Sequence, residues 1–191
     1  MDKSRDRFWE LMKPEHEKAV VFCRKLMGDR DSGDDLYQDA LVKAMSCFED
    51  LRDHGAFRSW LYRVMVTTFR STVRRPWWKR RARLTDEHQE MLVGDNPLDQ
   101  HTARRWLQRA FKAVSTDDQA LVTLYELDQW TIAEVAELYG TSEGAIKTRL
   151  YRARRKMKQA LTAFAERGTE TQASTDANGG SQCAATKPGS D

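Results

Sequence analysis

The chain has 191 residues, enough for one domain of moderate size or two small ones, and a formal net charge of +3 at pH 7. It starts without the apolar core of a signal peptide, and no apolar run is long enough to span a bilayer, so we expect a cytoplasmic protein without a membrane contact. Its cysteines are widely spaced, with no CxxC pair and no histidine at ligand spacing. We therefore expect neither a disulfide framework nor a metal site.

The small net charge conceals strong segregation of charge along the chain. Residues 29–53 contain eight acidic and three basic residues, whereas residues 56–84 contain nine basic residues and none that is acidic. Such blocks of opposite charge indicate two different partners. One partner would bind the acidic block, and the other, a polyanion, would bind the basic block.

Apolar residues recur at helical spacing and no segment alternates convincingly, so we predict an all-α fold of two small helical domains. Three helices are predicted in the first domain, over residues 15–27, 34–51 and 57–75. Gly28 ends the first of them and Pro76 the third. These elements place the first domain at residues 10–76.

The next segment, residues 77–95, is too polar and irregular for a core element and is predicted to be a flexible linker. Two further helices are predicted, over residues 96–114 and 115–127. The second domain is then expected at residues 96–166. Beyond it the chain has little to bury, so residues 167–191 are predicted to be a disordered tail.

Residues 131–158 have the pattern of a helix-turn-helix motif. Thr131 and Glu134 predict a capping box, Gly140 ends the first helix, and Thr141 or Ser142 can cap the second. Since residues 144–165 hold seven basic residues and no acidic one, an ordinary solvated helix is the weaker interpretation. Such a second helix enters the DNA major groove, and its candidate contacts are Lys147, Thr148, Arg149, Arg152 and Arg155.

The predicted helix 57–75 carries a second basic surface. Four of its residues are spaced so that they align on one stripe: Arg63, Thr67, Arg70 and Arg74. This stripe could follow a nucleic-acid backbone, and aromatic residues on which bases can stack lie at both of its ends. Phe57 and Trp60 fit the apolar face and are assigned to the core, whereas Trp77 and Trp78 are left open between packing and DNA contact.

The predicted helix 34–51 carries a polar strip opposite its apolar face, made of Asp35, Gln38, Asp39 and Val42. On its own this strip is no more than a solvated surface. Asp34 and Asp35 are adjacent and so point to different sides of a helix, and the four histidines are isolated along the chain. We therefore predict no catalytic site, no metal and no cofactor, and hence no enzyme.

The order of these parts resembles the small two-domain extracytoplasmic-function (ECF) sigma factors of the sigma-70 superfamily. DDLYQDALVKAM followed by GAFRSWLYRV resembles the family's region 2, and LDQWTIAEVAELYGTSEGAIKTRLYRARRKMK resembles its region 4. The resemblance covers about residues 15–161. Both motifs in this order are much more specific than a helix-turn-helix alone.

The resemblance implies a function for each surface. The strip of Asp35, Gln38, Asp39 and Val42 would bind the clamp helices of the largest RNA polymerase subunit. The loop of Asp53, His54 and Gly55, together with the stripe of Arg63, Thr67, Arg70 and Arg74, would hold flipped bases and the melted strand of the promoter −10 element. The second helix of the motif would read the −35 duplex. Core RNA polymerase and promoter DNA are thus the implied partners, and an anti-sigma factor is compatible with them.

Two other functions fit part of the same pattern. The chain could be a stand-alone helix-turn-helix regulator whose first helices serve for dimerisation or sensing. It could also be a helical RNA-binding or adaptor protein that uses the basic residues 58–83 without sequence preference. Neither alternative explains why an acidic helix and a basic helix precede the helix-turn-helix in this order.

Overall fold

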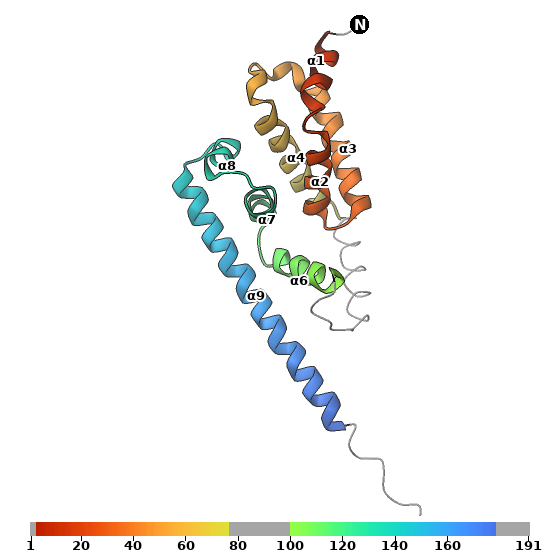
Figure 1. Ribbon diagram of the computed structural model, residues 1–191, viewed down its shortest axis with the longest axis vertical. Coiled ribbons are helices and arrows are strands. Elements are labelled where there is room, and N and C mark those ends of the chain that lie inside the picture. The colour runs from red at the N-terminus through yellow and green to blue at the C-terminus, as the bar shows by residue number, and fades with distance from the viewer. Residues whose placement is uncertain (1–2, 77–99, 179–191) are drawn as a thin grey trace, which may run out of the picture.

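The computed structural model describes residues 3–76 and 100–178 (Figure 1). Within these two ranges the regular structure is helical and no strand occurs, which confirms the all-α prediction. The predicted linker, with Trp77 and Trp78, lies outside the described residues, as does the end of the predicted tail, residues 179–191.

The first helical group is a bundle of α1 (Lys3–Met12), α2 (His16–Met27), α3 (Arg30–Ser46) and α4 (Phe57–Arg74), with the 3-10 turns η1 (Phe48–Asp50) and η2 (His54–Ala56) between α3 and α4. The predicted ends of α2 and α4 agree with these bounds to within one residue. Helix α1 begins before the predicted domain start at residue 10 and was not expected. It joins the bundle because Phe8 and Met12, one helical turn apart, are both buried in the core.

Helix α3 begins four residues before its predicted start at Asp34. The Asp29 side chain caps it by accepting a hydrogen bond from the Ser32 backbone N–H at 2.8 Å. Gly33 lies in its first turns, where α3 crosses α2 closely. A Cβ atom at Gly33 would lie 2.4 Å from Arg24 Cα, so the crossing requires glycine.

Gly33→Ala should therefore lower the free energy of unfolding by about 1 to 3 kcal/mol, because the added methyl group meets backbone atoms that cannot rotate away. Urea unfolding followed by circular dichroism measures this change. The matched control is Gly144→Ala, since a Cβ at Gly144 has no atom within 4 Å. If both variants unfold like the unmodified protein, the close crossing of α2 and α3 is not a constraint.

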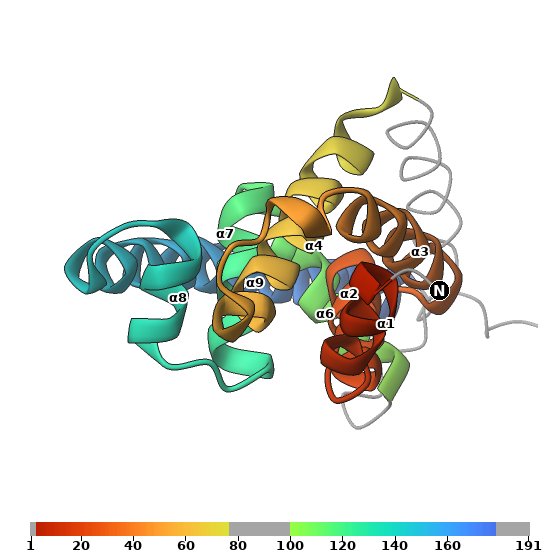
Figure 2. The same cartoon turned by 90° about the horizontal axis from the view of Figure 1, so that it is seen from above.

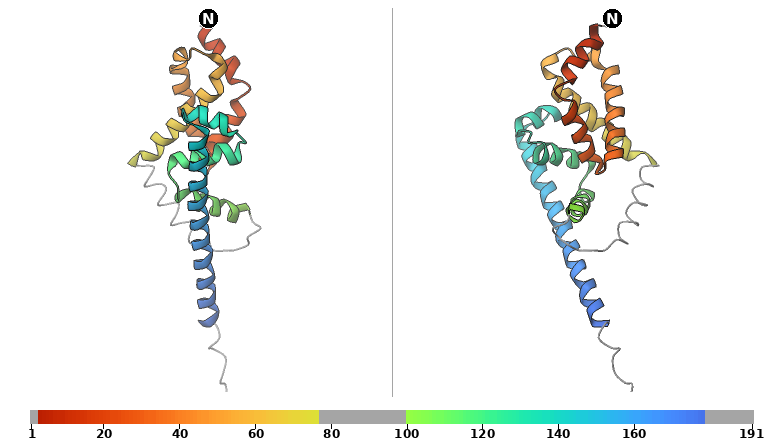
Figure 3. Two further views of the ribbon diagram at one scale, coloured as in Figure 1. Left: turned by 90° about the vertical axis from the view of Figure 1, so that its left-hand side faces the viewer. Right: turned by 45° about the vertical axis from the view of Figure 1, so that its right-hand side comes forward.

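The second helical group comprises α6 (Gln100–Lys112), α7 (Thr116–Val122), the π-helical turn η3 (Thr123–Leu127), α8 (Ile132–Tyr139) and α9 (Glu143–Asn178). The C-terminal part of α9 projects away from the rest of the molecule, as both views of Figure 3 show. Its backbone remains helical past Gly168, where the predicted tail starts, as far as Asn178. The first part of the predicted tail, residues 167–178, thus continues the backbone of α9.

The two helical groups pack against each other and share one apolar cluster. Helix α4 contacts both α7 and α8, which lie beside it when the molecule is seen from above (Figure 2). At this contact the rings of Tyr62 and Trp130 lie 4.8 Å apart between centroids, and both residues are buried. The sequence predicted two separate domains, and the structure adds an apolar contact between them.

Candidate nucleic-acid interface

The helix-turn-helix forms as predicted from its local signals. Thr131 Oγ1 accepts from the Glu134 backbone N–H at 3.2 Å, and Glu134 Oε2 accepts from the Thr131 backbone N–H at 2.8 Å, which completes the capping box. The bond from the Thr131 N–H holds the pKa of the Glu134 carboxyl below its usual value. Gly140 ends α8 in the left-handed region, at φ 61°, and Ser142 Oγ caps α9 by accepting from the Ala145 N–H.

Thr131→Ala should cost about 1 kcal/mol of unfolding free energy, because it leaves the Glu134 backbone N–H in the first turn of α8 without its side-chain partner. Thermal unfolding followed by circular dichroism measures the loss. Thr141→Ala is the matched control, since Thr141 is exposed and Ser142 supplies the cap of α9. Equal stability of the two variants would contradict a stabilising role for the box.

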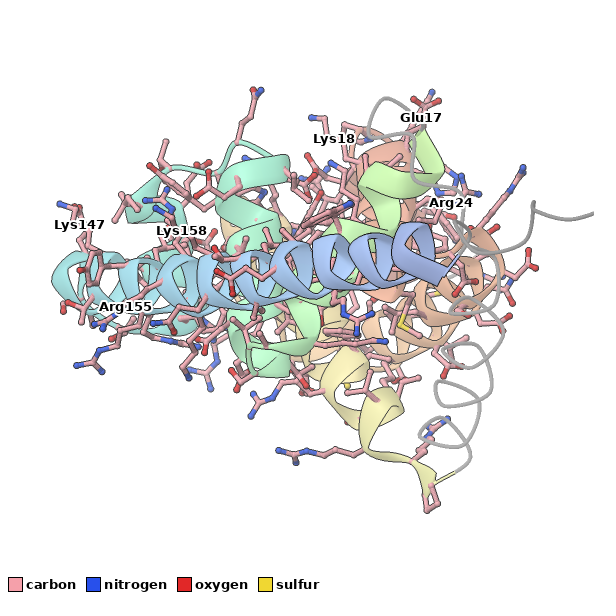
Figure 4. All side chains as sticks on the ribbon, turned by 90° about the horizontal axis from the view of Figure 1, so that it is seen from below. Glu17, Lys18, Arg24, Lys147, Arg155 and Lys158 are labelled. Carbon is pink, nitrogen blue, oxygen red and sulfur yellow. The ribbon has the colours of Figure 1, made fainter. Side chains whose placement is uncertain are left out.

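Helix α9 has one buried face and one exposed basic face. Ile146, Leu150 and Ala153 are buried on the face of α9 that packs against the other helices of the second group. On the other side, four of the five predicted contacts are exposed to solvent: Lys147, Thr148, Arg152 and Arg155. Figure 4 shows Lys147, Arg155 and Lys158 projecting from this half of the helix. The exposed side chains can therefore reach a duplex.

Arg149, the fifth predicted contact, faces the protein instead. Its Nη2 and Nε lie 2.9 and 3.2 Å from Asp118 Oδ1, and its guanidinium lies 5.2 Å from the centroid of the Tyr139 ring. The Tyr139 hydroxyl donates to the Asp117 carbonyl, and burial raises the pKa of that hydroxyl. Arg149 thus connects α9 to α7 and α8 in this structure.

Tyr151 is a candidate contact that the sequence analysis missed. It is 66% exposed, an unusual position for a large aromatic ring, and it lies on α9 among the basic residues. An exposed ring on this face can make apolar contact with a thymine methyl group or pack along the sugars. The helical spacing from Lys147, four residues earlier, could have identified it.

The stripe on α4 divides into two pairs. Thr67 and Arg74 are exposed, and within the described residues neither side chain has a partner. Arg63 and Arg70 instead contact the second helical group. Arg63 Nε donates to the Leu138 carbonyl at 2.8 Å, and Arg70 Nε lies 3.1 Å from Asp117 Oδ1. In this arrangement two of the four residues of the predicted stripe, Arg63 and Arg70, are bound to the second helical group.

The predicted loop of Asp53, His54 and Gly55 forms the compact turn η2 ahead of α4. Asp53 Oδ1 accepts from the Gly55 backbone N–H at 2.8 Å. The His54 ring is stacked on Phe48 with centroids 5.3 Å apart, and all three loop residues are exposed. The turn therefore presents an exposed aromatic ring, stacked on Phe48, directly ahead of α4.

The predicted polar strip of α3 is an exposed surface. Asp35, Gln38, Asp39 and Val42 are all exposed, and Val42 exposes 67% of its surface although it is aliphatic. Asp39 Oδ2 lies 3.9 Å from Arg75 Nη1, a distant surface pair. The adjacent Asp34 faces α2, where Arg24 donates to it at 2.6 and 3.0 Å and lowers the pKa of its carboxyl.

The described part of the chain contains no group of three or more histidine, cysteine or acidic residues placed to hold a metal ion. It also contains no helix that is long and apolar enough to cross a membrane. The chemically distinctive features of the described residues are thus the exposed acidic strip and the two basic surfaces. The helical fold and these surfaces together define the class of the protein: it is all-α and carries a helix-turn-helix of the DNA-binding type.

Comparison with known proteins agrees with this class and narrows it. The Sigma-70 region 2 family model matches residues 11–79, and the Sigma-70, region 4 model matches residues 104–157. The chain belongs to the sigma-70 family, in its ECF branch. Because region 2 accounts for the first helices, a stand-alone regulator is not favoured.

The relatives support the same assignment. The chain is 28% identical over 160 residues to the RNA polymerase sigma-E factor of Streptomyces coelicolor. The matched region covers 82% of this chain and 86% of that protein. It is 28% identical over 154 residues to the ECF RNA polymerase sigma factor SigM of Mycobacterium tuberculosis, with 81% and 76% covered.

Solved structures share the fold. The sigma factor RpoE from Bartonella quintana, in complex with the anti-sigma factor NepR, has a TM-score of 0.56 at 21% identity and covers 82% of this chain and 97% of that one. CnrH, in complex with the cytosolic domain of CnrY, has a TM-score of 0.56 at 23% identity, with 83% and 90% covered.

Proposed function

We propose that the protein is an initiation factor that joins core RNA polymerase, directs it to promoters with a −35 and a −10 element, and helps to nucleate strand opening. The observation that carries this function is that an exposed acidic strip on α3 and an exposed basic face on α9 belong to one chain that matches regions 2 and 4 in order. The protein itself catalyses no reaction and works in the cytoplasm with the polymerase, which performs the chemistry.

The basic face of α9 is assigned to the −35 duplex. Lys147, Thr148, Arg152 and Arg155 are the contacts, and Tyr151 joins them because it is exposed on the same helix. Arginine side chains that reach guanine edges supply base discrimination, and those that reach phosphates supply affinity. Arg149 orients the helix through Asp118 in the free protein.

The turn η2 and the stripe on α4 are assigned to the −10 element. Asp53, His54 and Gly55 border the position of an extruded base, since the exposed His54 ring offers a stacking surface. Thr67 and Arg74 are available to the melted strand in the arrangement described. Arg63 and Arg70 become available once the second helical group moves away.

The strip of Asp35, Gln38, Asp39 and Val42 is assigned to the clamp helices of the largest polymerase subunit. Carboxylates around an exposed aliphatic residue form the polar rim and apolar centre of a small docking surface for a basic helical partner. We also propose an anti-sigma factor as a regulatory partner. The sigma factor RpoE in the similar solved structure from Bartonella quintana is bound to the anti-sigma factor NepR.

Run-off transcription with purified core polymerase on a library of genomic fragments tests this function. We expect discrete transcripts from a subset of fragments only when the protein is present, and the selected fragments should share two separated sequence elements. Selection of a palindromic site by the isolated protein, with no transcription on addition of polymerase, would instead support a stand-alone regulator.

A further inference from the structure

Trp9 is an exposed aromatic residue on a helix to which the proposed function assigns no role. It exposes 42% of its surface, whereas its neighbour Phe8 is buried in the core. The region 2 match starts at residue 11, so membership of the family implies no role for Trp9 either. Since a single exposed apolar residue needs no explanation by itself, the surroundings of Trp9 decide what it can do.

The immediate surroundings of Trp9 are basic. Arg5 lies one helical turn before it and Lys13 one turn after it, where the Lys13 backbone N–H donates to the Trp9 carbonyl at 3.0 Å and continues the helical spacing. Both cations are exposed, and within the described residues neither forms an ion pair, whereas Arg7 is paired with Glu10 at 2.8 Å. An aromatic ring between two unpaired cations suits a single nucleic-acid strand, because a base stacks on the ring while the cations reach the flanking phosphates.

Helix α1 lies next to the turn that is assigned to the extruded base. The Phe8 ring contacts the rings of Phe48 and Phe57 edge to face, at 5.2 and 5.7 Å between centroids. Phe48 in turn is stacked on His54, and the Trp9 ring lies edge-on to Phe8 at 5.5 Å. A continuous series of ring contacts therefore joins Trp9 to His54. Figure 1 shows α1 at the end of the first helical group that also carries the connection from α3 to α4.

The position of α1 extends the proposed strand-binding surface in one direction. Phe57 is the first residue of α4, so its contact with Phe8 places α1 at the end of α4 where the stripe starts. The stripe runs away from this end toward Arg74. A strand that follows the stripe and inserts a base at η2 therefore reaches α1 next. The nucleotides that it brings there adjoin the extruded base, so they are unpaired and have a free face for stacking.

The charges around α1 favour stacking as the main contribution to binding. Glu49 and Asp50 are exposed on η1, which contacts α1, and Asp6 is exposed on α1 itself. These carboxylates reduce the attraction that Arg5 and Lys13 exert on a phosphate backbone. Stacking on an aromatic ring depends far less on net charge and tolerates any base. Removal of the ring should therefore weaken strand binding more than removal of either cation.

We propose that Arg5, Trp9 and Lys13 form a further single-strand site, in which Trp9 stacks on an unpaired base of the non-template strand beyond the base extruded at η2. This inference rests on the proposed function of η2 and of the stripe on α4. The ligand is single-stranded DNA of any sequence, held by one ring and two cations. The site therefore prolongs the hold on the opened strand without adding a sequence preference.

An abasic scan of the opened strand tests the site. The polymerase-bound protein is assembled on a promoter selected by run-off transcription, with mismatches across the opened region so that loss of a base leaves the cost of melting unchanged. Single non-template bases are removed in turn, and the lifetime of each complex is measured after a challenge with excess competitor DNA. With the unmodified protein, removal of one base beyond the extruded position should shorten the lifetime about five- to 150-fold, the range of base–aromatic stacking.

Trp9→Ala should shorten the lifetime on the intact strand by a similar factor, and removal of the same base should then have no further effect. Trp9→Phe retains a ring and should keep the dependence on that base, which separates stacking from a change in the fold of α1. Arg5→Ala should shorten the lifetime less than Trp9→Ala. Val21→Ala is the matched control, because Val21 is a similarly exposed apolar residue, 44% exposed on α2, and should behave like the unmodified protein.

The site is overturned if no base beyond the extruded one affects the lifetime, or if Trp9→Ala and the unmodified protein depend on that base equally. Weaker binding of Trp9→Ala to core polymerase before any DNA is added would make Trp9 a polymerase contact and would also overturn the site. Failure of the proposed function is a separate result, namely no promoter-dependent run-off transcript from the unmodified protein. A protein that is active in run-off transcription, but whose complexes do not depend on Trp9, would refute the strand site alone.

Discussion

Asp35→Lys combined with Asp39→Lys should abolish association with core RNA polymerase while the fold stays intact. Both side chains are exposed on α3, and the 3.9 Å approach of Asp39 to Arg75 is the one ion pair that they form within the described residues. Losing an exposed pair costs little stability. On the polymerase, by contrast, two lysines would face the basic surface that the carboxylates are proposed to meet.

The expected loss of affinity is at least on the order of a hundredfold, since like charges brought together at an interface cost several kcal/mol and 1.4 kcal/mol is a factor of ten. Surface plasmon resonance with immobilised core polymerase measures it. Asp6→Lys with Glu17→Lys makes the same change in net charge at exposed residues of α1 and α2, and should bind almost normally. Normal binding by the Asp35 and Asp39 variant would remove the docking assignment.

Arg152→Ala should weaken binding to the −35 duplex by about 1 to 3 kcal/mol and leave stability unchanged. Arg152 is exposed on the basic face of α9, and no partner contacts its side chain within the described residues. A single arginine that reaches a base edge supplies discrimination of this size. Competition between the selected promoter and one altered in the −35 element should show reduced preference between the two.

Arg149→Ala is the informative comparison for Arg152→Ala. Arg149 is paired with Asp118 and packed on Tyr139, so its removal should lower the unfolding free energy and thereby weaken DNA binding without relaxing the sequence preference. Thermal unfolding and the same competition assay separate the two effects. If Arg149→Ala relaxes the preference at full stability, Arg149 is a base contact in the complex.

The helix-turn-helix was the most predictable part of the structure because its signals are local. The capping box of Thr131 and Glu134, the left-handed Gly140 and the cap at Ser142 each depend on residues within one helical turn. The exposed strip on α3 was also predicted, since an apolar face determines which residues lie opposite it. For this strip, helical periodicity alone was sufficient to predict which residues are exposed.

Other features depend on the tertiary arrangement and gave weaker signals. Gly33 looks like a residue that breaks a helix, yet it permits α3 to approach α2, so the predicted start of α3 was too late. The fate of Arg63 and Arg70 depends on where α7 and α8 lie, which no local pattern contains. Both arginines occupy the predicted stripe, but their partners come from residues far away in the chain.

Arg149 shows where a closer inspection of the periodicity would have helped. It lies three residues after the buried Ile146 and directly before the buried Leu150, so it borders the apolar stripe of α9. A long side chain at such a border commonly lies along the neighbouring element with its charge at the edge. Arg152 and Arg155 have their Cα atoms further from that stripe and are exposed.

The central claim is that the two basic surfaces bind separate parts of one promoter, α9 the intact duplex and α4 the opened strand. The most direct test places a photocrosslinking amino acid at Thr148 or at Thr67, both exposed, in the polymerase-bound protein on a promoter selected by run-off transcription. We expect Thr148 to crosslink to the upstream −35 duplex and Thr67 to the non-template strand of the −10 element. Crosslinking of both positions to the same DNA segment, or of Thr67 to closed duplex only, would contradict the account.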